Sequence, residues 1–97
     1  MPAYDGGQTY PLAFRAVHEK APNASGVYTL FTSRQWLYVG ESADIQQSLF
    51  RHLNESPAWM IRSPPLSFSF EPVPPLERVS RKQELVAKLA PAYTAAE

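Results

Sequence analysis

The first half of the chain carries one helical and two strand-like patterns. A helix is predicted over residues 9–22, with Thr9 as its N-cap, because apolar residues recur at helical spacing: Leu12, Phe14, Val17 and Ala21. Two runs rich in β-branched and aromatic residues follow at 26–31 and 35–40, separated by polar residues. These runs predict an antiparallel hairpin.

The second half predicts a helix, a strand and a final helix. From residue 43 to about 55, apolar positions recur every four residues and favour a helix that Ser42 caps. Residues 65–73 alternate large apolar side chains with serine and glutamate, which is typical of a strand with one buried face. The last helix is expected over about 76–90. This order of elements predicts a small α/β layer structure.

Composition narrows the class of protein. The 97 residues are 44% hydrophobic, which suits a single domain over residues 1–97. Nine basic and nine acidic residues leave no net charge, so nucleic-acid binding would need a local basic patch. The absence of cysteine excludes disulfides and thiolate chemistry. No apolar run approaches a membrane span and the first ten residues show no signal peptide, so a soluble cytoplasmic protein is expected.

Two tripeptides in the sequence match motifs of a known family. The stretches "GVY" at 26–28 and "YVG" at 38–40 precede a helix ending "FRHL" and a last helix followed by "PAYT". From about residue 24 to 94, this pattern resembles the GIY-YIG endonuclease family. The resemblance implies a three-stranded antiparallel sheet flanked by helices. It also implies metal-dependent cleavage of a DNA phosphodiester, with two tyrosines beside the attacking water.

The resemblance assigns some family roles and leaves others unfilled. Tyr28 and Tyr38 match the two motif tyrosines, and His52 matches a histidine that many members carry. In contrast, the phosphate-binding arginine is replaced by Ser48 and the metal-binding glutamate by Lys82. The terminal asparagine corresponds to Thr94, and Glu41 follows "YVG", where members often carry lysine. Cleavage of an anionic phosphodiester needs a guanidinium fork and a hard cation, so these losses are expected to be severe.

Helix geometry indicates which residues can substitute. Arg51 lies about 60° around the helix from Ser48, so its long side chain could reach a phosphate near Tyr38. Glu84 lies about 200° from Lys82 and is expected to face solvent. The predicted inward arc of the last helix comprises Val79, Lys82, Val86, Leu89 and Ala90. The predicted solvated pairs are Glu77 with Arg81 and Glu84 with Lys88.

Each candidate also has a purely structural interpretation. Tyr28 and Tyr38 are interpretable as core aromatics of paired strands, and His52 as a packed histidine. Lys82 is interpretable as a side chain that extends past the edge of the core. Two further large residues, Trp59 and Met60, are predicted either to cover the core or to contact a protein partner.

Three function hypotheses follow. We favour a pseudoenzyme with a GIY-YIG-like fold and no cofactor, in which Lys82 and Arg51 bind nucleic-acid phosphate, or which binds a protein. The alternative is an active DNA endonuclease dependent on Mg²⁺ or Mn²⁺, with a relocated site that uses Tyr28, Tyr38, Arg51 and His52. The third hypothesis is a structural or protein-interaction domain. The missing arginine and glutamate favour the first.

Overall fold

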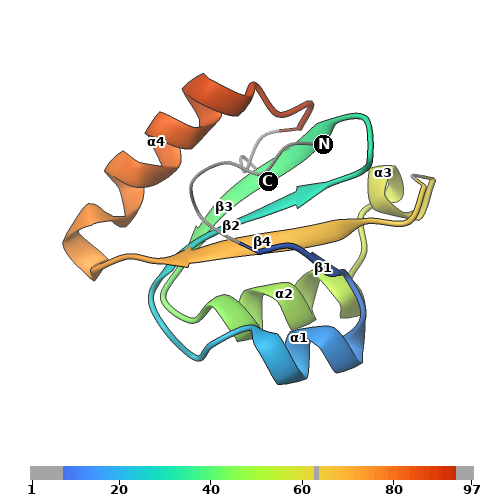
Figure 1. Ribbon diagram of the computed structural model, residues 1–97, viewed down its shortest axis with the longest axis horizontal. Helices are drawn as coiled ribbons and strands as arrows, with labels where there is room; N and C mark the ends of the chain where they lie inside the picture. Colours follow the sequence, from blue (N-terminus) through green and yellow to red (C-terminus); the bar gives the residue numbers. More distant parts are fainter. Residues whose placement is uncertain (1–7, 63, 94–97) are drawn as a thin grey trace.

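Four antiparallel strands form the middle layer of the protein in the computed structural model, which describes residues 8–62 and 64–93. In spatial order they are β1 (Tyr10–Pro11), β4 (Ser67–Pro72), β2 (Gly26–Phe31) and β3 (Trp36–Ser42). Helices α1 (Phe14–Lys20) and α2 (Ile45–Asn54) cover one face, and α4 (Arg78–Leu89) covers the other (Figure 1). The short helices α3 (Ala58–Ile61) and η1 (Pro75–Glu77) lie in the connections.

The predicted hairpin is confirmed and fixes the position of the two motif tyrosines. Strands β2 and β3 pair with Tyr28 opposite Gly40 and Leu30 opposite Tyr38. Because directly opposed residues lie on the same face of a sheet, both tyrosine side chains point to the α2 side. The tip of the hairpin is closed by a hydrogen bond from the Thr32 N–H to the carbonyl of Gln35, at 2.9 Å.

The sheet has one strand more than the three predicted, because residues 10–11 are extended rather than helical. Tyr10 pairs with Phe68 as strand β1, and α1 begins only at Phe14. The Thr9 cap is therefore wrong: Ala13 is the N-cap, and no side chain caps this helix. Pro11 suits an edge strand, where no ladder partner requires an N–H donor.

Strand β4 is buried on both faces, whereas its alternating sequence pattern predicted a strand with only one buried face. Phe68 and Ser69 point to opposite faces, and each is at most 1% exposed. The Ser69 hydroxyl lies 2.5 Å from that of Thr29 on β2, so the two satisfy each other across the strands. Serine thus marks a buried position here, because a neighbouring threonine supplies its hydrogen bond.

Two helix predictions need correction at their ends and faces. Helix α2 is capped by Asp44 rather than Ser42, since the Asp44 carboxylate accepts the Gln47 N–H at 3.1 Å. In α4 the fully buried residue is Leu85, and Val79 is 56% exposed instead of lying on the inward arc. The buried side of α4 centres on Leu85, with the half-buried Lys82 and Leu89 beside it, so Val79 falls outside this side.

The charged pairs on α4 also differ from the pairs predicted from their four-residue spacing. Arg81 bonds Glu71 of β4 at 2.9 Å and Glu84 at 3.1 Å, rather than pairing with Glu77. These hydrogen bonds, first to Glu71 and then to Glu84, raise the pKa of the Arg81 guanidinium. The carboxylate of Glu84 is solvent-exposed as expected. Within the described residues, Lys88 forms no ion pair.

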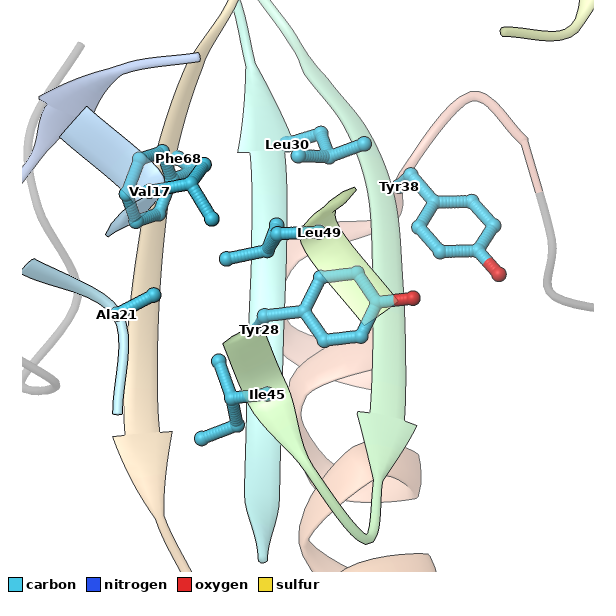
Figure 2. Close-up of a cluster of buried hydrophobic side chains, with 8 residues drawn as sticks. All are labelled: Val17, Ala21, Tyr28, Leu30, Tyr38, Ile45, Leu49 and Phe68. Atoms are coloured by element: carbon cyan, nitrogen blue, oxygen red, sulfur yellow. The ribbon is translucent and has the colours of Figure 1, made fainter. Parts of the chain in front are cut away.

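Each face of the sheet has its own hydrophobic cluster. The cluster under α1 and α2 includes both motif tyrosines (Figure 2) and comprises Val17, Ala21, Tyr28, Leu30, Tyr38, Ile45, Leu49 and Phe68. The cluster under α4 is smaller and comprises Val27, Val39, Val73 and Leu85. In the described ranges, no helix combines the length and the apolar character needed to cross a lipid bilayer.

Candidate functional site

Tyr28 is a core residue whose ring extends across the neighbouring strand. The side chain is only 2% exposed. A Cβ atom on Gly40 would lie 2.5 Å from the Cζ atom of the Tyr28 ring, so position 40 accepts only glycine without a shift of that ring. The motif glycine is therefore needed to make room for the tyrosine ring.

The two motif tyrosines meet His52, which α2 presents to the sheet. The Tyr28 hydroxyl lies 2.9 Å from His52 Nε2, a hydrogen bond whose donor is set by the imidazole tautomer. The Tyr38 ring stands edge-on to the imidazole, with centroids 5.0 Å apart. Figure 2 shows both phenol hydroxyls on the same side, away from Val17 and Phe68. The structure therefore brings these three predicted site residues together.

A cavity of about 200 Å³ opens beside these aromatic residues. We call it the aromatic hollow; it is lined by Tyr38, Arg51, His52, Glu55, Pro57 and Trp59. The Trp59 ring stacks on Tyr93 with centroids 4.5 Å apart, and the Tyr93 N–H donates to the Leu37 carbonyl of β3. Trp59 and Met60 are partly buried against the core cluster, so covering the core accounts for their size.

A second, more open cavity of about 370 Å³ lies where β3 ends and α2 begins. We call it the ionic hollow; it is lined by Glu41, Ser42, Ala43, Asp44, Gln47, Ser48, Arg51 and Arg78. Arg51 borders both hollows and is exposed. Within the described residues, its guanidinium forms no ion pair.

Ser48 occupies the position that the resemblance assigns to the phosphate-binding arginine. It is 5% exposed, and its hydroxyl lies 2.6 Å from that of Ser42. The two hydroxyls form a neutral hydrogen bond in the wall of the ionic hollow. Arg51, one turn further along α2, is therefore the guanidinium on this helix that borders the cavity.

Arg78 is a site residue that the sequence analysis missed. Its Nε donates to Glu41 at 2.8 Å and its Nη1 donates to the Ser25 hydroxyl at 3.2 Å, so α4 contributes a cation to the ionic hollow. Lys82 follows one helical turn later; it is half-buried and lines neither hollow. Two signals pointed to Arg78: its spacing of four residues from Lys82, and the opposite charge of Glu41.

The carboxylates near this site do not fit a divalent cation. Glu41 is neutralised by Arg78 at 2.8 Å, and Asp44 is bonded by the Asn23 amide at 3.2 Å as well as by the α2 backbone. Over residues 8–62 and 64–93, no three histidine, aspartate or glutamate side chains converge as metal ligands. Thr94, the predicted counterpart of the family asparagine, lies outside the described residues.

Comparison with solved structures supports the fold. The chain is similar to the GIY-YIG N-terminal endonuclease domain of UvrC from Thermotoga maritima bound to magnesium, with 21% identity and a TM-score of 0.67 over 82% of this chain and 93% of that one. A point mutant of that domain with its catalytic divalent cation gives 20% identity over the same shares, with a TM-score of 0.67. No protein-family model and no curated protein matches the sequence. The chain therefore has a GIY-YIG-like fold.

Proposed function

We propose that this chain binds the phosphate groups of nucleic acid through Arg51 and Arg78 and does not cleave them. The observation that carries the proposal is the ionic hollow, an open cavity that two arginines from different helices border and that shares Arg51 with the aromatic hollow. On the resemblance, the α4 side of this site would carry a metal-binding glutamate. Here Arg78 supplies a fixed positive charge from that helix, and Lys82 follows one turn later.

The chemistry of the two guanidinium groups suits phosphate. A guanidinium has five N–H donors, and in the described part of the chain Arg78 uses its Nε and Nη1 groups for Glu41 and Ser25. The remaining donors match the forked geometry of phosphate oxygens. Glu41 and Asp44 offset part of the positive charge in the hollow, so we expect modest affinity that falls as salt rises.

Binding of labelled single-stranded DNA at several salt concentrations tests the proposal. Replacing Arg51→Gln should weaken binding and reduce the slope of log K against log salt by about one, because one phosphate contact is lost. Arg34→Gln is the matched control, since Arg34 is exposed at the tip of the hairpin, away from the end of β3. Equal effects of the two substitutions would contradict phosphate binding in the ionic hollow.

A cleavage assay tests the second part of the proposal. We expect no nicking of plasmid or branched DNA in the presence of Mg²⁺ or Mn²⁺, because Glu41 and Asp44 already have protein partners. Metal-dependent cleavage that Tyr38→Phe abolishes would overturn this expectation.

The Tyr28–His52 hydrogen bond favours one alternative function, an active endonuclease. A phenol and an imidazole 2.9 Å apart can exchange a proton during attack by water. On this hypothesis Glu41 is the relocated metal ligand, and Arg78 competes with the metal for it. Arg78→Gln should then increase Mg²⁺-dependent nicking. If both the wild-type protein and this variant leave DNA intact, the alternative is excluded.

A further inference from the structure

We propose that the aromatic hollow holds one unpaired nucleobase of the nucleic acid whose phosphate lies in the ionic hollow. This inference deepens the proposed function and rests on it. Its ligand class is single-stranded nucleic acid, or a duplex with a base displaced from the stack. The relevant observation is that Arg51 lines both cavities, so a phosphate and the adjacent base can be bound on either side of one guanidinium.

The walls of the aromatic hollow suit a planar ring. Tyr38, His52 and Trp59 contribute aromatic surface, on which bases of any sequence can stack. Arg51 on α2 and Glu55, the residue that caps the end of this helix, line the same cavity, so one can donate and the other accept hydrogen bonds at a base edge. The cavity of about 200 Å³ is smaller than a typical drug-sized site, which favours a single small ring system.

The stacking surface is held in place before any ligand arrives. Trp59 packs on Tyr93 at 4.5 Å with the rings only 11° from parallel. Tyr93 is itself fixed by its backbone hydrogen bond to β3, at 2.9 Å. His52 is oriented by its hydrogen bond to Tyr28. Because these rings are already ordered, little conformational freedom is lost when a base enters.

A pair of probes separates the base from the phosphates. One probe is a short thymidine oligonucleotide, and the other is an abasic chain with the same number of phosphates. The wild-type protein should bind the thymidine probe about tenfold more tightly, the size of effect expected for stacking of a single base. Pairing the thymidines with a complementary strand should remove this advantage, since paired bases are not available to the cavity.

Protein variants locate the effect. Trp36→Phe leaves Trp59 as the only tryptophan, and its fluorescence should change with the thymidine probe and not with the abasic probe. Trp36 contacts Phe31 in a tilted ring pair and packs against the other face of the sheet, so this replacement leaves the hollow intact. In Trp59→Leu, checked for folding by thermal melting, the two probes should bind alike. Arg51→Gln should weaken both.

The possible outcomes distinguish this inference from the proposed function. If the wild-type protein binds both probes equally and depends on Arg51, phosphate binding stands and the nucleobase assignment is wrong; an aromatic side chain of a protein partner then becomes the better occupant. If neither probe binds, the proposed function fails and the nucleobase assignment fails with it. A tenfold preference for thymidine that does not alter Trp59 fluorescence would also overturn the assignment.

Discussion

The aromatic and ionic halves of the candidate site differ in how far the fold requires them. In the aromatic half, Tyr28 is 2% exposed and Tyr38 is 5% exposed, and both belong to the main hydrophobic cluster. In the ionic half, Ser48 forms a neutral hydrogen bond with Ser42, and Arg78 forms a partly exposed ion pair with Glu41. The first half is part of the core, whereas the second lines an open cavity.

This difference shows why motif tyrosines are weak evidence for activity. A buried tyrosine is retained by packing whether or not it takes part in a reaction, since its loss leaves a cavity. A charged residue at the rim of an open cavity contributes little to folding, so it can change when its chemical role ends. The ionic half is therefore the better indicator of what the site does.

Tyr28→Ala tests the structural role of the aromatic half and should have the largest effect. Removing this ring leaves a cavity between α2 and the sheet, which should lower the free energy of unfolding by about 3–5 kcal/mol. Chemical denaturation followed by circular dichroism measures this loss. A loss below about 1 kcal/mol would show that packing does not hold the tyrosine in place.

Gly40→Ala probes the same half from the neighbouring strand. The new Cβ would approach the Tyr28 ring to 2.5 Å, so the ring must move and stability should fall by about 1–3 kcal/mol. The double variant Gly40→Ala with Tyr28→Leu is the control. Because the clash is with the ring, the glycine substitution should cost less in that background, and fully additive effects would contradict this explanation.

Arg78→Gln tests the ionic half and should change stability by only about 0.5–1 kcal/mol, because its pair with Glu41 is partly exposed. Binding of single-stranded DNA should nevertheless weaken clearly, since the substitution removes a cation and leaves the Glu41 charge unneutralised. If Arg78→Gln lowered stability as much as Tyr28→Ala, the ionic half would be as important to folding as the aromatic half, and the proposed difference between them would be wrong.

Ser48→Arg combined with Lys82→Glu introduces the two residues that the GIY-YIG resemblance assigns to these positions, and its folding must be checked because Ser48 is only 5% exposed. We expect divalent-metal binding with a dissociation constant on the order of 10⁻³ M, measured by calorimetry with Mn²⁺. The matched control places the carboxylate about 100° further around the same helix turn: Ser48→Arg with Gln83→Glu. A folded Ser48→Arg, Lys82→Glu variant that binds no metal would contradict the placement of the metal position on α4.

The fold was more predictable from the sequence than the site. The hairpin followed from its β-branched and aromatic runs, and the register placed both tyrosines on one face. The pattern failed at β1, where two residues pair with a strand distant in sequence, and at Ser69, whose burial depends on Thr29 across the sheet. Such long-range partners leave no local periodicity.

The same limit applies to the functional residues. Arg51 was selected because the resemblance placed the family arginine at Ser48 and helical spacing puts Arg51 on the same side of the helix. Arg78 was missed because its role depends on Glu41 and Ser25, which are 37 and 53 residues away in the sequence. Whether Lys82 contacts phosphate stays a prediction.

The segment after α4 also covers part of one edge of the sheet. Ala90 turns the chain with a left-handed backbone, at φ 48°, and the next residues run back along β3. The N–H groups of Ala92 and Tyr93 bond the carbonyls of Trp36 and Leu37, so part of this edge strand is already paired. The opposite edge, β1, is only two residues long. Among the described residues, both borders of the sheet are therefore partly shielded from edge-to-edge pairing with another molecule.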